Sequence, residues 1–227
     1  MQTDKFNILA SWEENALAWI ETIQNNEIRS RELITNQAIV EAILSTSPST
    51  VLDAGCGEGW LCRELNKYDI YTVGIDGVSA LIEQARKLGK GNYFTISYED
   101  ILQGKSNGLS LYDAIVFNYS IFEKESTIDL FEIIKTHLNI NGKIIIQTIS
   151  PKNELFAERP ENGWMTEHWD GLNDKYKTAF NWYYRSEKEW LGLFEKTGFK
   201  LLNKREVIHT ETGKFFSVIY VVEKQMF

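Results

Sequence analysis

Short apolar runs alternate with helical patterns along most of this 227-residue chain, and this alternation limits the folds that are open to it. Helical patterns at 60–68, 79–89 and 126–139 lie between strand-like runs. A strand followed by a crossover helix and another strand predicts a parallel sheet with right-handed connections and helices on both faces. The runs with the length and β-branched composition of buried strands are 49–55, 71–76, 92–97, 112–118 and 142–150.

The end of the chain departs from this alternation. Two strand-like runs, 199–209 and 214–224, are separated only by "TETG", which is too short for a crossover helix. They therefore predict an antiparallel hairpin. The expected α/β fold is a seven-stranded, mostly parallel sheet with an antiparallel C-terminal strand.

Two segments lie outside the alternation. Residues 1–46 carry two amphipathic helical patterns and are expected to form a helical cap. Residues 151–185 are rich in aromatic side chains and are expected to form an insert or lid before the last helix, where Ser186 and Glu189 have capping-box spacing. We expect a single domain. Its parts are the cap at 1–46, a binding core at 47–150, the insert at 151–185, and the last helix and hairpin at 186–227.

The stretch "VLDAGCGEGW" at 51–60 places a glycine loop directly after the first expected strand. Ligands of open parallel sheets bind beyond the carboxyl ends of the strands, so this loop is a binding loop by position. Gly55, Gly57 and Gly59 miss the dinucleotide spacing G-x-G-x-x-G, because Trp60 stands where the third glycine belongs. This disfavours an NAD-dependent oxidoreductase.

Two acids narrow the choice of ligand. Asp53 precedes the loop, where a carboxylate would repel a pyrophosphate but suits a cationic group. Asp76 ends the second strand, where an acid can accept hydrogen bonds from both hydroxyls of a ribose. An ammonium, a closely approached glycine backbone and a ribose together describe S-adenosylmethionine.

On these residues the sequence resembles the class I S-adenosylmethionine-dependent methyltransferases over residues 48–224. The pattern is closest to ubiquinone-biosynthesis-like small-molecule O-methyltransferases. The resemblance implies a Rossmann-like fold and an enzyme that transfers a methyl group to a small molecule, at oxygen, by in-line displacement. S-adenosylhomocysteine would be the product.

The resemblance also implies roles for individual residues. Asp53 and the Gly55 backbone would hold the methionine amino group, Asp76 would take the ribose, and Arg31 could reach the cofactor carboxylate. Many relatives place an acid for the adenine amine where this chain has "SYEDI" at 97–101, so Tyr98 and its neighbours are candidates. The expected cofactor-binding set is Arg31, Asp53, Gly55, Cys56, Gly57, Gly59, Asp76, Gly77, Glu99, Asp100, Ile101 and Asn118.

The acceptor pocket is expected over the carboxyl ends of the fourth and fifth strands, below the cap and the insert. An aromatic insert can line a substrate pocket or simply pack onto its own domain as a lid. His168 in the insert and His209 at the end of the sixth strand are candidate bases, with an ordinary polar contact as the alternative for each. The expected substrate contacts are Tyr119, Gln147, Trp164, Trp169 and Tyr183.

Charge and composition make several other classes of function less favoured. The net charge of −8 and the absence of a basic patch disfavour nucleic acid as a substrate. There is no run of 18 apolar residues and no basic, apolar leader, so we expect no membrane span and a cytoplasmic location. Cys56 and Cys62 lack metal spacing and suit a reduced compartment, and no metal is expected.

Three alternatives stay open from the sequence. The chain could bind S-adenosylmethionine without turnover, or it could methylate protein or tRNA. Its oligomeric state could be a monomer or a homodimer.

Overall fold

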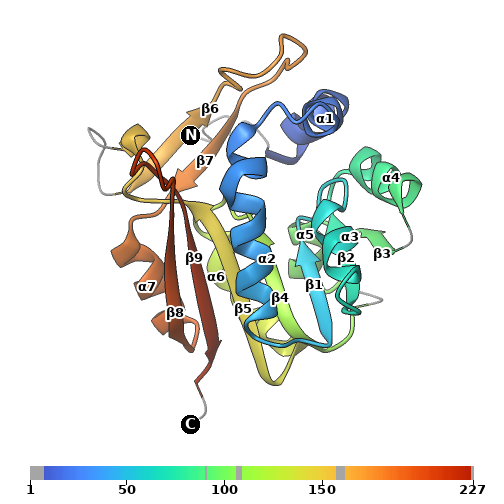
Figure 1. Cartoon of the computed structure of the whole chain (residues 1–227). Helices are drawn as coiled ribbons and strands as arrows, with labels where there is room; N and C mark the ends of the chain where they lie inside the picture. Colours follow the sequence, from blue (N-terminus) through green and yellow to red (C-terminus); the bar gives the residue numbers. More distant parts are fainter. Residues whose placement is uncertain (1–7, 90, 106–108, 157–161, 226–227) are drawn as a thin grey trace, which may run out of the picture.

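A computed structural model describes residues 8–89, 91–105, 109–156 and 162–225 of the chain. Its central sheet has the strand order β3-β2-β1-β4-β5-β9-β8 (Figure 1). The first five strands in this order pair in parallel, and β9 pairs antiparallel with both β5 and β8. The predicted fold class is confirmed. The strands are β1 Thr50–Ala54, β2 Tyr71–Asp76, β3 Asn92–Thr95, β4 Tyr112–Asn118, β5 Leu138–Ile149, β8 Phe199–Ile208 and β9 Phe215–Lys224.

Helices cover both faces of this sheet because its central strands are apolar on both sides. Along β4, Ala114 and Val116 face one layer, and Ile115 and Phe117 face the other. The first layer contains α2 (Asn36–Leu44) and α3 (Trp60–Asn66), and α4 (Ser79–Leu88) continues it beside β3. The second layer contains α5 (Tyr98–Leu102), α6 (Ser126–Ile134) and α7 (Glu187–Lys196).

One strand begins earlier than its sequence pattern predicted. β5 was expected from residue 142 but starts at Leu138, which pairs with Tyr112 across a register shift in β4. Gly142 lies in this irregularity, where an added Cβ would come within 2.9 Å of the Tyr112 carbonyl oxygen. The helix before it ends at Ile134 and continues only as a short 3-10 turn, Lys135–His137.

The N-terminal region forms helices, as its pattern predicted. α1 (Ile8–Gln24) contacts α4 and β7, and a π-helical turn, η1 (Arg31–Thr35), leads directly into α2. Residues 1–7 of the expected cap lie outside the described residues. Within the described ranges, no helix has the length and apolar character needed to cross a membrane.

The aromatic insert contains a second, two-stranded sheet that the sequence pattern did not predict. β6 (Gly163–Glu167) and β7 (Phe180–Tyr184) pair antiparallel, and η3 (Glu154–Phe156) precedes them. Strand β6 exposes Trp164 and turns Glu167 toward the protein. Trp164 and Glu167 therefore depart from the usual alternation of buried apolar and exposed polar residues, which hides this strand from period-two patterning.

Candidate functional site

The glycine loop lies where the strand order reverses, at the carboxyl ends of β1 and β4. Open α/β sheets bind ligands at this switch point. Gly55, Gly57 and Gly59 all have positive φ angles, of 79°, 56° and 80°, which side-chain-bearing residues rarely adopt. The chain therefore needs glycine at each of these positions to turn from β1 into α3.

The three glycines differ in what surrounds them. A Cβ on Gly55 would lie 2.4 Å from Ser120 Cβ, and one on Gly59 would lie 2.7 Å from Tyr93 Cε1. A Cβ on Gly57 would meet only Trp19 Nε1, at 3.8 Å. Gly57 is thus the loop residue whose backbone is open to a ligand lying between the loop and α1.

Asp76 ties this loop to the end of β2. Its Oδ2 accepts a hydrogen bond from the Gly57 backbone N–H at 2.9 Å, and its Oδ1 accepts one from Val78 N–H, also at 2.9 Å. Burial raises the pKa of the Asp76 carboxyl. Each carboxylate oxygen keeps a lone pair, so the group can accept further bonds from ligand hydroxyls. The bond to Val78 also supports the entry into α4.

Asp53 is a buried carboxyl beside the loop with an unsatisfied oxygen. Its Oδ2 accepts from the Cys62 thiol at 3.7 Å, while its Oδ1 has no hydrogen-bond partner among the described residues. Burial, reinforced by the charges of Asp76 and Glu58, raises the pKa of Asp53 to about 7. An unpaired buried acid next to two other acids favours a cationic ligand group.

The Cys56 thiol, in the same loop, packs in a small buried cluster with Ile82 and Tyr93. Burial raises its pKa well above the ordinary value, so it stays protonated.

Arg31 reaches the same region from the π-helical turn. Its guanidinium lies over the rings of Trp60, at 5.1 Å, and Trp19, at 5.9 Å. No ion pair engages it within the described part of the chain. Burial lowers its pKa, and the charges of Glu58 and Tyr119 oppose that shift. A partly buried cation without a bound carboxylate suits the carboxylate of a ligand.

The candidate residues at the start of α5 point in different directions, and Tyr98 is the one that reaches the glycine loop. Asp100 forms a capping box with Ser97 at the start of α5, Glu99 is exposed, and Ile101 is fully buried in the core. Instead, Tyr98 points to the glycine loop: its hydroxyl donates to the Ala54 carbonyl at 3.0 Å and contacts Ser120 Oγ at 2.9 Å. Adenine contact by Glu99 or Asp100 and cofactor contact by Ile101 remain predictions.

Two further predicted cofactor residues flank the loop. Gly77 lies under α1, since a Cβ there would come within 2.7 Å of Leu9 Cδ1. Asn118 ends β4, and its Oδ1 is buried without a hydrogen-bond partner among the described residues.

A cavity of about 70 Å³ lies over the carboxyl ends of β4 and β5, where the acceptor pocket was expected. Ser120, Tyr119 and Gln147 line it from the sheet. Phe180 and Trp182 line it from the insert hairpin, and Trp190 closes it from α7. Ser120 also belongs to the glycine loop's surroundings, because its Oγ donates to the Ala54 carbonyl at 2.7 Å. The cavity and the loop therefore meet at Ser120.

Two of the expected substrate contacts are anchored in the wall of this cavity. Gln147 Nε2 donates to the Thr35 carbonyl at 3.1 Å and contacts Ser217 Oγ at 2.9 Å, which leaves its buried Oε1 without a partner in the described part. Tyr119 has a positive φ of 53°. Burial raises the pKa of its phenol to about 12, while hydrogen bonds with Ser217 and Thr35 act in the opposite direction.

The other predicted substrate and base residues lie away from the cavity lining. Trp169 is buried between α1 and the insert, with its ring centroid 5.0 Å from that of Trp12. Trp164 packs edge-on against Tyr183. His168 is exposed after β6.

His209 closes β8. Its Nδ1 accepts from the Thr212 N–H, at 3.3 Å, and its ring packs against Phe216. Substrate contact by Trp164, Trp169 and Tyr183 and base roles for His168 and His209 remain predictions.

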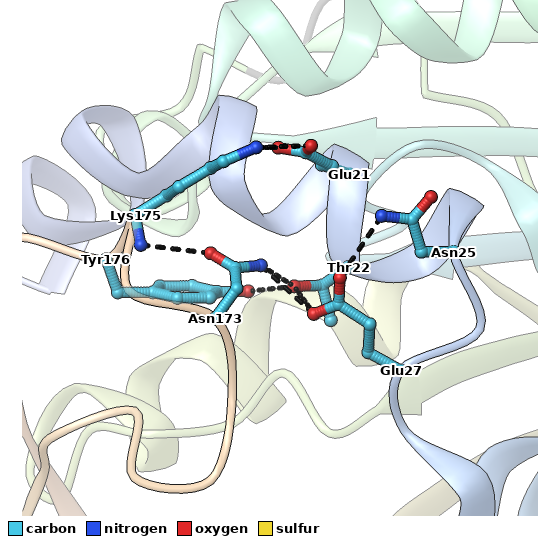
Figure 2. A network of polar contacts seen from close by, with 7 residues as sticks. All are labelled: Glu21, Thr22, Asn25, Glu27, Asn173, Lys175 and Tyr176. Atoms are coloured by element: carbon cyan, nitrogen blue, oxygen red, sulfur yellow. Dashed lines mark hydrogen bonds and ion pairs between the residues drawn. The ribbon is translucent and has the colours of Figure 1, made fainter.

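A polar network joins the end of α1 to the insert, and we call it the clasp (Figure 2). Its centre is the buried hydroxyl of Thr22, which donates to Glu27 Oε2 at 3.1 Å. The same hydroxyl contacts Asn173 Nδ2 and the Tyr176 hydroxyl, each at 3.0 Å. An ion pair between Glu21 and Lys175 flanks it. The clasp therefore links the helix that lies on the glycine loop to the insert that lines the cavity.

Comparison with known proteins places this geometry in context. A family model described as a methyltransferase domain matches residues 26–204. A search of curated proteins found no match.

Several solved structures share the fold. A Leishmania major S-adenosylmethionine-dependent methyltransferase has a TM-score of 0.68 and 16% identity, covering 95% of this chain and 81% of its own. One from Clostridium acetobutylicum has a TM-score of 0.61 and 16% identity, covering 93% and 99%. The Burkholderia thailandensis 1,6-didemethyltoxoflavin-N1-methyltransferase, solved with its acceptor and S-adenosylhomocysteine, has a TM-score of 0.62 and 14% identity, covering 93% and 88%. Such identities show a shared fold alone.

Proposed function

We propose that this chain, which belongs to the methyltransferase-domain family and is an S-adenosylmethionine-dependent methyltransferase, methylates a small-molecule acceptor at oxygen. S-adenosylmethionine supplies an electrophilic methyl group on a sulfonium. The chain's own task is to bind this donor, align an acceptor with it and exclude water.

The residues around the glycine loop fit such a donor. Asp53 would attract the ammonium, and the unpaired Arg31 would bind the carboxylate at the other end of the methionine portion. Asp76 would accept bonds from the ribose hydroxyls, and the open backbone at Gly57 would allow close approach. The ammonium and the carboxylate of the donor would thus each meet a protein group of opposite charge, and the loop geometry leaves space for the donor at Gly57.

The observation that carries the acceptor class is the cavity that meets the loop at Ser120. One water needs about 10–15 Å³ of such volume, so 70 Å³ corresponds to roughly five waters, the size of a small ring rather than of a folded macromolecular segment. Its walls are largely aromatic and aliphatic, as in many small-ligand sites. A hydroxylated ring of the kind used by ubiquinone-biosynthesis-like O-methyltransferases fits this description.

Incubation with labelled S-adenosylmethionine and fractionated cell extract tests the proposal. We expect S-adenosylhomocysteine to form and the label to enter a small molecule that has gained one CH₂ unit on oxygen, as located by mass spectrometry and NMR. Label found only in protein or tRNA fractions would contradict the proposed acceptor. Donor binding without any S-adenosylhomocysteine would contradict turnover.

A further inference from the structure

The insert hairpin turns one face toward the cavity, and that face carries a single charged side chain. Glu167 pairs with Phe180 across the hairpin, and both line the cavity with Trp182. On the opposite face, Thr166 Oγ1 hydrogen-bonds to Asn181 at 2.8 Å, away from the cavity. Because neighbouring side chains of a strand alternate between faces, the backbone itself directs Glu167 inward.

The Glu167 carboxylate is held at one oxygen and free at the other. Its Oε1 accepts a hydrogen bond from the Trp169 backbone N–H at 2.7 Å. Its Oε2 has no hydrogen bond or ion pair within the described residues. Glu167 is half-buried, and its Oε2 keeps both lone pairs available to a hydrogen-bond donor of a ligand in the cavity.

No other carboxylate belongs to the cavity lining formed by the described residues. The other ionisable side chain there is Tyr119, whose pKa burial raises to about 12, so its phenol is neutral at physiological pH. The remaining walls contribute hydroxyl, amide and apolar groups. Glu167 is therefore the carboxylate of this lining that is placed to accept a proton from an acceptor.

We propose that Glu167 binds the hydroxyl of the methyl acceptor and accepts its proton, and that this acceptor is a single aromatic ring bearing an acidic, phenol-like hydroxyl. The inference rests on the proposed function, since it assumes that the acceptor occupies this cavity. Gln147, whose buried Oε1 lacks a partner among the described residues, offers a second acceptor from β5 for another donor on the ring.

The chemistry of a carboxylate selects oxygen over nitrogen. As the acceptor oxygen forms a bond to the methyl carbon, the carbon–sulfur bond of the donor breaks and S-adenosylhomocysteine leaves. The hydroxyl proton passes to Glu167 and then to solvent, which the half-buried side chain can reach. A carboxylate beside an amine would instead favour the ammonium, which has no lone pair for attack. The hydroxyl of a phenol, whose pKa is about 10, becomes much more acidic as its oxygen bonds to the methyl carbon, so the proton leaves during that step.

The test uses 4-nitrophenol, a one-ring phenol whose absorbance distinguishes phenol from phenolate. It is titrated into the S-adenosylhomocysteine complex of the wild type, of Glu167→Gln and of the control Glu154→Gln, whose carboxylate is exposed and pairs with Lys214. We expect the wild type and the control to bind the phenol form and to raise the pH at which the bound probe ionises, because Glu167 repels the phenolate. Glu167→Gln should lose that shift.

Two outcomes would overturn the inference. If Glu167→Gln ionises the bound probe at the same pH as the wild type, Glu167 does not contact the acceptor, while the proposed O-methylation stands. If the wild type holds S-adenosylhomocysteine but binds no 4-nitrophenol, the phenolic class is wrong, and extract labelling decides the proposed function separately.

A kinetic measurement with the acceptor found by extract labelling separates catalysis from binding. General-base catalysis contributes about 100-fold or more, so Glu167→Gln should lower kcat by that order with a smaller change in KM. An unchanged kcat would contradict the proton-accepting role.

Discussion

Asp76 Oδ2 accepts a hydrogen bond of 2.9 Å from the backbone N–H of Gly57, so the end of β2 holds the glycine loop that follows β1. β1 and β2 are parallel neighbours, and their carboxyl ends lie at the same edge of the sheet. The expected ribose acceptor and the expected donor-binding loop are thus one connected unit. A substitution at Asp76 should therefore weaken the binding of the ribose and loosen the glycine loop at the same time.

Asp76→Ala tests this unit. The variant loses the ligand hydroxyl contacts and the support of Gly57, and we expect S-adenosylmethionine affinity to fall by about 1–3 kcal/mol. Isothermal titration with the donor and with S-adenosylhomocysteine measures the change. Asp113→Ala is the matched control, because Asp113 also accepts hydrogen bonds from two backbone N–H groups. These belong to Ser49 and Thr50, at the start of β1 and so at the opposite end of this strand from the glycine loop. Equal affinity of Asp76→Ala and wild type would contradict the ribose role.

Gly57→Ala separates ligand approach from backbone strain. The added methyl meets Trp19 only at an ordinary contact distance of 3.8 Å, so the fold should persist at a cost of about 1–2 kcal/mol for its positive φ. Donor affinity should fall at least tenfold, because the methyl occupies the open side of the loop. Gly213→Ala carries a comparable φ of 70° with no neighbour within 4 Å of the added Cβ, and should keep full affinity. If both variants lost donor affinity equally, the cause would be backbone strain at a positive φ and not the loss of space for the ligand.

Asp53 gives the protein a pH dependence with a definite sign. The unfolded carboxyl loses its proton near 3.8 and the folded one near about 7, so the folded state holds the extra proton between these values. The free energy of unfolding of the free protein should therefore decrease as pH rises from about 4 to about 7. Asp53→Asn should remove this loss and be more stable than wild type at pH 8. Denaturant titrations at pH 5 and pH 8 measure the free energy of unfolding of both proteins. If this free energy changes equally with pH in wild type and in Asp53→Asn, the role of Asp53 is contradicted.

The same carboxyl should control donor binding in the opposite sense. The ammonium of S-adenosylmethionine favours the ionised form of Asp53, so wild-type affinity should rise about tenfold between pH 6 and pH 8 relative to Asp53→Asn. Competition titrations at each pH measure the ratio. A constant ratio would place the ammonium elsewhere.

Sequence patterns located the parts of the site that belong to the sheet. The acid at the end of a strand, the glycine loop and Gln147 are placed by strand register, which hydrophobic alternation reveals directly. The antiparallel hairpin followed from a connection too short for a helix. The position of a residue along its strand therefore predicts whether it lies at the carboxyl edge of the sheet, where the site is.

Features set by tertiary packing were not predictable in this way. Ser120 joins the loop to the cavity, and Glu167 faces the cavity from the hairpin face that also carries Phe180 and Trp182. Trp164 was expected at the substrate because aromatic residues often line pockets, yet it lies on the outer face of that hairpin. Aromatic composition indicates burial or binding, but it does not specify the side of a strand that faces the ligand.

Thr22→Val tests whether the clasp controls access to the donor site. The substitution keeps the shape of the buried side chain but removes its hydrogen bonds with Glu27, Asn173 and Tyr176, which weakens the hold of the insert on the end of α1. Losing a buried hydrogen-bonding group costs about 1–3 kcal/mol, and tenfold in rate corresponds to about 1.4 kcal/mol. The side chains of Trp19 and Leu9 place α1 beside Gly57 and Gly77, so we expect the position of α1 to limit entry of the donor.

We therefore expect S-adenosylhomocysteine to associate and dissociate about tenfold faster in Thr22→Val, with a smaller change in Kd, as measured by stopped-flow tryptophan fluorescence. Thr136→Val is the control, because Thr136 is exposed in the turn after α6 and its hydroxyl donates to the Ile133 carbonyl, far from the clasp. Hydrogen exchange should increase in α1 and in residues 173–178 together, since the clasp joins them. Faster exchange in α1 alone would show that the insert and the helix open independently, and unchanged rates would show that α1 does not limit entry.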